Sequence, residues 1–214
     1  MSQGVPTAQA ADLPTESDGE TKSERIIRLA GDLFLEHGYD SVSINDIIEV
    51  AGGSKGTIYF NFGSKEKLFE AVIEKMCSDV TVKIDIRSSG TIEDQLTRIA
   101  YSFVNMVLTP EILKFHRLVT SMGRAFPEAG RLFYDTGPRT ACGIIATWIS
   151  LQQEKGLIRN DSDPFRLAIL FHDMLIGDSI MRWQTSAVSE GQRLERIDET
   201  VALTVRVFLQ GVAA

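Results

Sequence analysis

The 214 residues, 43% hydrophobic and 24% charged, are ordinary for a soluble globular protein and suffice to bury a substantial core in one domain or two. The formal net charge of −7 argues against non-specific coating of nucleic acid, although it leaves room for a local basic patch. No apolar run approaches the length of a membrane helix, and the N-terminus lacks a signal peptide's basic start and apolar run. We therefore expect a cytoplasmic protein without a membrane partner.

The first predicted elements are an acidic arm and a helix. Residues 1–20 carry four acidic residues, no lysine or arginine and no apolar periodicity, so they are predicted to be disordered. Thr21 and Glu24 then have the spacing of a capping box. Apolar residues follow at helical spacing until Gly38, which is suited to end a helix in a left-handed conformation. A helix of about four turns is predicted here.

Two much shorter helices are expected next. Ser43 can cap the first, which Gly52 and Gly53 stop, and Ser54 can cap the second at once. Ser64 can cap a longer fourth helix. Two short helices that are joined by a tight glycine turn and braced by longer helices are typical of a helix-turn-helix, which would span residues 43–62.

The second short helix has the composition of a DNA-contacting element. Along "KGTIYFNF", a lysine, a threonine, a tyrosine and an asparagine recur at every second position. Their ammonium, hydroxyl, phenol and amide groups suit phosphates and base edges. Lys65 follows Ser64 at a helix N-terminus, where free amides already favour a phosphate. Two alternatives to DNA contact remain. The lysines could form a solvated basic face, and the two short helices could be a surface helical hairpin without a partner.

Residues 21–80 resemble the TetR-type transcriptional regulators through "ERIIRLAGDLFLEHGYDSVSINDIIEVAGGSKGTIYFNFGSKEKLF". The resemblance implies a DNA-binding domain over 21–80, with double-stranded DNA as a partner. It also implies that these residues face DNA: Ser43, Ser54, Lys55, Thr57, Tyr59, Asn61 and Lys65. Three positions depart from the family pattern, because Gly53 replaces an apolar turn residue, Phe60 a hydroxyl or indole side chain, and Asn61 a frequent histidine.

Residues 85–214 are predicted to form a larger helical effector-binding and dimerisation domain, which makes the chain all-α. Its last two segments, 164–183 and 193–210, are apolar on more than one face, as in a deep core or a subunit interface. The resemblance implies that the last two helices build a homodimer, and a two-fold dimer would read a palindromic operator. The residues assigned to this interface are Phe165, Ile169, His172, Ile176, Ile180, Leu203, Val205 and Phe208.

Large, adaptable side chains in the second domain point to a small apolar or amphipathic effector. Ligand pockets between helices combine apolar walls with a few polar groups, and glycines and prolines interrupt the helices between 123 and 138. Residues 116–138 also resemble regulators of efflux pumps. The predicted ligand residues, each of which could instead simply fill the core, are Phe103, Met106, His116, Met122, Phe126, Trp148 and Met174.

No pattern of catalytic residues is found. The three histidines lie far apart in sequence, and no metalloprotease, hydrolase or phosphate-loop motif occurs. Cys77 and Cys142 lack zinc-ligand spacing and are expected to be buried thiols. We therefore expect no catalytic site, no metal and no cofactor. The preferred interpretation is a ligand-responsive, homodimeric transcriptional regulator, most simply a repressor. A ligand-free DNA-organising or adaptor role is the alternative, which a cavity in the second domain would oppose.

Overall fold

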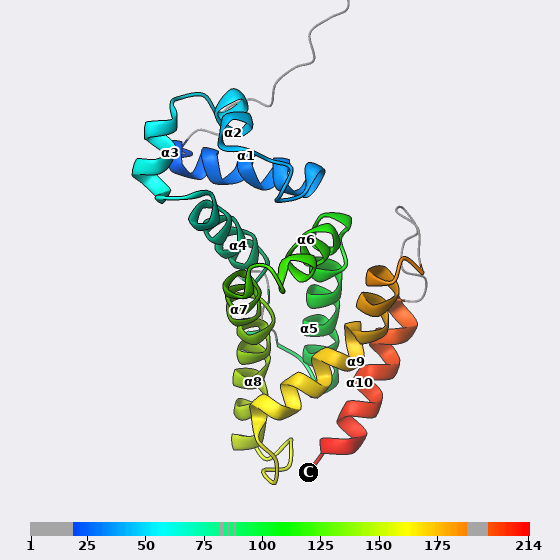
Figure 1. The fold of residues 1–214 in the computed structure, drawn as a ribbon. Helices are drawn as coiled ribbons and strands as arrows, with labels where there is room; N and C mark the ends of the chain where they lie inside the picture. Colours follow the sequence, from blue (N-terminus) through cyan, green and yellow to red (C-terminus); the bar gives the residue numbers. More distant parts are fainter. Residues whose placement is uncertain (1–18, 82–83, 85, 88, 188–196) are drawn as a thin grey trace, which may run out of the picture.

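The computed structural model describes residues 19–81, 84, 86–87, 89–187 and 197–214, and within them the chain is all-helical (Figure 1). Within these residues, one isolated antiparallel β-bridge pairs Ile158 with Ala213. The described helices are α1 (Lys22–His37), α2 (Ile44–Ala51), α3 (Lys55–Phe62), α4 (Lys65–Thr81), α5 (Ile92–Val107), α6 (Pro110–Met122), α7 (Pro127–Thr136), α8 (Pro138–Glu154), α9 (Pro164–Gln184) and α10 (Ile197–Val212).

Helix boundaries follow the capping signals of the sequence. The Thr21 hydroxyl accepts from the Glu24 amide at 3.2 Å, and the Glu24 carboxylate accepts from the Thr21 amide at 2.8 Å, which completes the capping box of α1. Gly38 ends this helix with φ of +80°, a conformation that favours glycine. Residues 1–18 of the predicted arm lie outside the described residues, whereas Glu20 pairs with Arg28 of α1 at 2.9 Å.

One hydrophobic core joins the first three helices to α4. Phe34 of α1, Ile47 of α2, Ile58 of α3 and Phe69 of α4 are all at most 1% exposed. The same cluster continues into α6 and α7, which contribute the buried side chains of Phe115, Val119, Met122 and Ala129. The hydrophobic core of the predicted first domain therefore includes side chains from beyond residue 80, where the sequence predicts the domain boundary.

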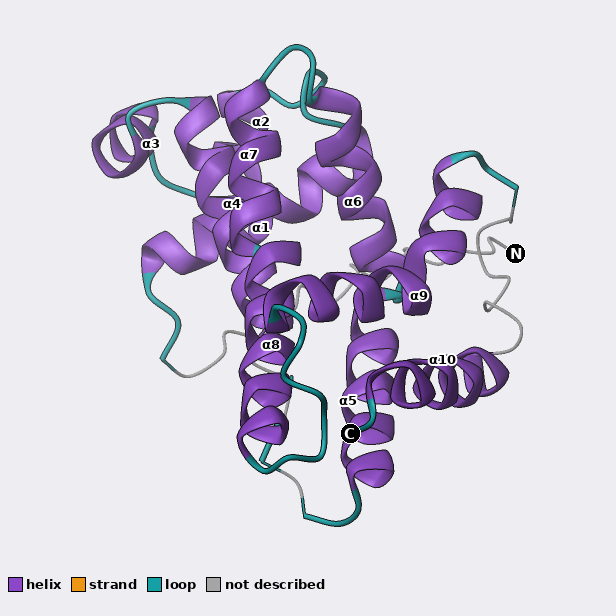
Figure 2. Cartoon of the chain, turned by 90° about the horizontal axis from the view of Figure 1, so that it is seen from below, coloured by secondary structure: helices purple, strands orange, loops and turns teal. Residues whose placement is uncertain are grey.

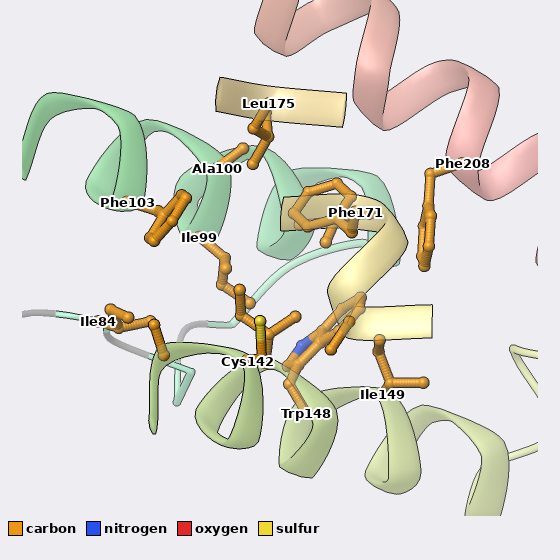
Figure 3. Close-up of a cluster of buried hydrophobic side chains, with 14 of the residues drawn as sticks. Ile84, Ile99, Ala100, Phe103, Cys142, Trp148, Ile149, Phe171, Leu175 and Phe208 are labelled. Atoms are coloured by element: carbon orange, nitrogen blue, oxygen red, sulfur yellow. The ribbon is translucent and has the colours of Figure 1, made fainter. Parts of the chain in front are cut away.

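A second hydrophobic core lies among α5, α8, α9 and α10 (Figure 3). Phe171 of α9 meets Phe208 of α10 edge-on, with ring centroids 5.0 Å apart. The indole of Trp148 is fully buried and donates through Nε1 to Gln95 at 3.1 Å, so its polar group is satisfied. In Figures 1 and 2, α9 runs from α8 toward α10. Helix α5 contacts both α9 and α10 and lies behind α9 in the view of Figure 1.

Candidate DNA-binding surface and effector cavity

The short helix α3 presents its polar side chains on two sides rather than in one row. Two residues turn an α-helix by about 200°, so alternate positions point to opposite sides. Lys55 and Tyr59 are exposed together on one side of α3. Asn61 lies on the other side, where its Nδ2 donates to the Thr57 carbonyl oxygen at 2.9 Å. The four predicted contact residues therefore flank the helix as two pairs.

Phe60 occupies the centre of the exposed face of α3. Its side chain is 91% exposed, whereas Ile58, two positions earlier, is 1% exposed and anchors the helix in the core. An aromatic side chain held in solvent on a helix of eight residues needs an explanation, because burying it would be favourable. Phe60 was absent from the predicted contact set. Its placement opposite Ile58 and Phe62 on the helical wheel was the signal that could have found it.

Three serines cap the helices around this surface. The Oγ atoms of Ser43, Ser54 and Ser64 accept from main-chain amides at 3.3, 3.3 and 3.2 Å, at the starts of α2, α3 and α4. The side chains of Ser43 and Ser54 are exposed, and each hydroxyl keeps a hydrogen with which it can donate. Helix N-termini with exposed hydroxyls are suited to phosphate oxygens.

One shallow depression brings together five of these polar residues. Ser43, Lys55, Tyr59, Ser64 and Lys65 line it from α2, α3 and α4. Its two lysines differ, because Lys55 is exposed whereas Lys65 is half-buried. The Lys65 ammonium donates to the Tyr39 carbonyl oxygen at 2.6 Å, and burial lowers the pKa of Lys65. Ser54, Thr57 and Asn61 lie outside the depression.

A cavity of about 220 Å³ lies among α4, α5, α6, α7, α8 and α9. Its walls are mainly aromatic and aliphatic, with few polar groups. Its lining residues include Met76, Cys77, Val80, Phe103, Phe115, His116, Phe133, Ala141, His172, Asp173, Gly177, Met181 and Gln184. Of the predicted ligand residues, Phe103 and His116 line this cavity.

Two pairs of polar side chains line the cavity. His116 Nδ1 lies 3.1 Å from the side-chain amide nitrogen of Gln184, and His172 Nδ1 lies 2.8 Å from an Asp173 carboxylate oxygen. Burial lowers the pKa of His116, which favours its neutral form. Burial likewise raises the pKa of the Cys77 thiol, which therefore lines the wall as a weakly polar group.

The other predicted ligand residues lie elsewhere. Met122 and Phe126 belong to the core shared with α1–α4, and Trp148 is fully buried in the second core. Met106 lines a separate open groove, and Met174 is 41% exposed on α9. The cavity residues that the sequence did not indicate include Cys77, His172 and Met181. Phe115 and Phe133 also line the cavity, and both are among the large apolar side chains by which the composition of this domain indicates a ligand pocket.

The cavity and the first core share side chains. Phe115 and Phe133, whose rings meet edge-on at 5.6 Å, belong to the first core and also line the cavity. Helix α4 also contributes to both, because Phe69 and Val72 pack in the first core, where Phe69 meets Phe34 of α1 edge-on, whereas Met76 and Val80 line the cavity. A rigid helix thus connects the cavity wall to the base of α3.

The predicted dimer residues divide between the core and the surface. Ile176, Val205 and Phe208 are at most 6% exposed within one protomer, so their side chains stabilise the protomer itself. Phe165, Ile169, His172 and Ile180 are partly buried, and Leu203 is 51% exposed. The exposed apolar side chains of these helices form a set that we call the outer patch: Leu170, Met174, Met181, Leu203 and Val207.

Comparisons with known proteins identify the family. Residues 26–72 match the model of the bacterial regulatory proteins of the tetR family, and residues 94–211, more than half of the chain, match the C-terminal domain of AefR-like transcriptional repressors. The chain belongs to the TetR family of transcriptional regulators. It is therefore a DNA-binding protein, and the helix-turn-helix expected from the sequence is confirmed as the family's DNA-binding element.

Individual relatives of this TetR-family chain extend over nearly its whole length. It is 40% identical to the HTH-type transcriptional repressor AcnR of Corynebacterium glutamicum over 199 residues, which cover 92% of this chain and 96% of that one. A solved TetR-family regulator of Mesorhizobium loti matches with a TM-score of 0.84 at 25% identity, covering 93% of this chain and 100% of its own. The flavonoid-responsive regulator FrrA matches with a TM-score of 0.77 at 25% identity, covering 90% and 97%.

The described part of this TetR-family chain holds no group of three or more His, Cys, Asp or Glu side chains that could bind a metal ion. Over the same residues, no helix combines the length and apolar character needed to cross a membrane. Both cysteines are buried free thiols, as the sequence predicts.

Proposed function

We propose that the protein is a homodimeric repressor that binds a palindromic operator through α3 and is released when a small molecule occupies the cavity. The observation that carries this proposal is the sharing of walls between the cavity and the DNA-binding core through α4, Phe115 and Phe133. A ligand that requires a different position of α4 would move the base of α3. In a two-fold dimer this movement changes the separation of the two α3 helices, which must match half-sites about 34–36 Å apart or a multiple of that.

The walls of the cavity support an apolar effector of modest size. A cavity of about 150 Å³ can hold benzene, so 220 Å³ suits a ligand of about two fused rings or an equivalent aliphatic body. The His116–Gln184 and His172–Asp173 pairs provide polar groups that can orient it. The structural relative FrrA is a flavonoid-responsive regulator, and flavonoids are aromatic compounds too, although larger than two fused rings.

Repression is favoured by the relatives. Both AcnR of Corynebacterium glutamicum and ComR of Escherichia coli, which is 23% identical over 181 residues, are HTH-type transcriptional repressors. The alternative of a ligand-free DNA-organising or adaptor protein would fit a dry, filled second domain. The cavity between this domain and α4 favours the ligand-responsive function instead.

The proposal is tested in two steps. Genomic fragments that the purified protein retains are identified first, and a compound library is then screened for members that release them. The variant Ala141→Leu fills part of the cavity, and Ala202→Leu, at an exposed position of α10, is its matched control. We expect released fragments to stay bound to Ala141→Leu in the presence of the compound, while the control responds as wild type does. If Ala141→Leu and wild type respond equally, the effector does not act through this cavity.

A further inference from the structure

Helix α9 lines the cavity along its whole second half. The lining residues recur at helical spacing on one face, which consists of His172, Asp173, Ile176, Gly177, Ile180, Met181 and Gln184. At about 1.5 Å per residue, α9 rises by about 18 Å from His172 to Gln184. The cavity of about 220 Å³ is therefore elongated along α9.

A histidine lies near each end of this elongated cavity. At one end, the side-chain amide of Gln184 meets His116 of α6 at 3.1 Å. At the other end, His172 meets the carboxylate of Asp173 at 2.8 Å. The α9 residues that line the cavity between these two ends are apolar: Ile176, Gly177, Ile180 and Met181. Along α9 the cavity thus has an apolar middle and a polar group toward each end.

The partners of the two histidines determine which ring nitrogen carries the proton. An amide nitrogen can only donate, so His116 accepts from Gln184 at Nδ1, and the neutral ring carries its proton on Nε2. A carboxylate can only accept, so His172 donates to Asp173 from Nδ1, and the neutral ring accepts at Nε2. His116 can therefore donate a hydrogen bond to a ligand, whereas His172 can accept one from it.

The walls of the cavity match neither sign of ligand charge. The described residues that line it include no lysine or arginine, and burial lowers the pKa of His116, so a carboxylate would find no positive partner there. A cation would meet Asp173, which already accepts from His172 and is exposed to solvent. The hydroxyl of Thr81, which also lines the cavity, donates to the Cys77 carbonyl oxygen at 3.1 Å. The two histidines are thus the side chains that can select a ligand by its polar groups.

We infer that the effector is an uncharged, elongated compound with an apolar body and a different polar group at each end. A hydrogen-bond acceptor, such as a carbonyl oxygen, lies beside His116, and a donor, such as a hydroxyl, lies beside His172. This inference rests on the proposed effector cavity and names the class of compound that the cavity takes. A compound that lacks either group leaves one imidazole without its ligand partner, so it binds about tenfold more weakly.

The test uses bicyclic compounds of similar shape that differ in their polar groups. The compound 6-acetyl-2-naphthol carries a carbonyl and a hydroxyl at opposite ends. Its analogue 2-acetylnaphthalene lacks the hydroxyl, 2-naphthol lacks the carbonyl, and 6-hydroxy-2-naphthoate carries a negative charge in place of the ketone. Calorimetric titration at about pH 7.5, where an imidazole of ordinary pKa is mostly neutral, gives the affinity of the protein for each compound.

The variants remove one polar group at a time. His116→Phe and His172→Phe keep an aromatic ring against Phe133 and Phe103, whose centroids lie 5.4 and 5.2 Å from the two imidazoles. His116→Gln keeps a donor at this position and separates the lost hydrogen bond from lost packing. His37→Phe, at the exposed end of α1, is the matched control. Circular dichroism verifies that each variant is folded, and Ala141→Leu reports whether the compounds occupy the cavity.

We expect wild type and His37→Phe to bind 6-acetyl-2-naphthol about tenfold more tightly than each of the other compounds. In His172→Phe the advantage of the hydroxyl should disappear while the advantage of the carbonyl remains. In His116→Phe the carbonyl advantage should disappear and the hydroxyl advantage remain. His116→Gln should keep the carbonyl advantage, and its loss in this variant would contradict the role of residue 116 as a donor.

Two further results separate this inference from the proposed function. If Ala141→Leu weakens binding of every compound but wild type binds all of them equally, the cavity is the binding site and the inference is overturned. Absence of binding by 6-acetyl-2-naphthol overturns the inference as well. Compounds that bind Ala141→Leu as tightly as wild type would instead contradict the effector cavity, and with it both proposals.

Discussion

The ammonium group of Lys65 lies 4.1 Å from the centre of the Tyr39 ring and donates to the carbonyl oxygen of the same residue. Lys65 thereby joins the start of α4 to the loop between α1 and α2. Burial lowers the pKa of Lys65 and raises the pKa of Tyr39 to about 12. A lysine expected from the sequence to serve DNA alone therefore also contributes to the fold.

This arrangement predicts different effects for the two lysines of the depression. Lys55→Ala removes an exposed ammonium, so operator binding should lose about 0.9 units of the slope of log affinity against log salt, with thermal stability unchanged. Lys65→Ala should destabilise the protein by about 1 kcal/mol, since a charged hydrogen bond and a cation–π contact are lost. Salt-dependent fluorescence anisotropy and denaturant unfolding measure the two effects. An unchanged slope in Lys55→Ala would remove that residue from the phosphate contacts.

Phe60 should matter for DNA and hardly at all for stability. Its side chain is 91% exposed, so Phe60→Ala should change the free energy of unfolding by less than about 0.5 kcal/mol. If the ring contacts a thymine methyl group in the major groove, operator affinity should fall by about 1–3 kcal/mol, and the preferred base at that position should relax. The control is Val50→Ala on α2, also an exposed apolar residue. Competition binding with altered operator sequences measures both effects. If Phe60→Ala and Val50→Ala lose the same amount of operator affinity, Phe60 has no specific role in DNA binding.

Ser54 allows helix capping to be separated from DNA contact. Ser54→Ala should cost about 1 kcal/mol of stability, because the Thr57 amide loses its acceptor. Ser54→Asp keeps an acceptor and should restore stability, yet its charge would face phosphates and should weaken operator binding about tenfold. Thr109→Asp makes the same change at the N-terminus of α6, whose cap accepts from Ile112, and serves as the remote control. Wild-type operator affinity in Ser54→Asp would show that this serine is a cap only.

His116 should make stability depend on pH. Burial lowers its pKa in the folded protein, whereas the unfolded side chain takes up a proton near pH 6.5. As the pH falls through this value, the unfolded state binds more protons than the folded state, so the free energy of unfolding decreases. Below the lowered pKa that His116 has in the folded protein, this group causes no further decrease in the free energy of unfolding. Urea unfolding of His116→Gln between about pH 7 and pH 5 should show a smaller decrease than wild type, and parallel curves would contradict the assignment.

Local signals in the sequence predicted the helices well, because each cap is formed by neighbours in the chain. Thr21 and Glu24 form the expected capping box. The boundary between cores was harder to predict. Met122 lies in the core of the helix-turn-helix because α6 packs on α1 and α7 packs on α4, which are contacts between segments distant in sequence.

The sequence predicted an apolar ligand cavity in the second domain, but it predicted few of the residues that line this cavity. Apolar composition identifies residues able to line a cavity, but the same composition fills cores, as Trp148 does. Val205 and Val207 are both valines of α10, a helix that is apolar on several faces. Only the packing of α5 and α9 makes the first 2% exposed and the second 47% exposed. The faces of such helices follow from tertiary contacts, which one sequence read locally does not contain.

The central claim is that the cavity and the operator control each other. The most direct measurement is calorimetric titration of a releasing compound into the protein, once alone and once saturated with operator DNA. The account predicts that the operator weakens binding of the compound by the same factor by which the compound weakens operator binding, about 1.4 kcal/mol for each tenfold change. Equal affinity of the compound in both titrations would contradict it.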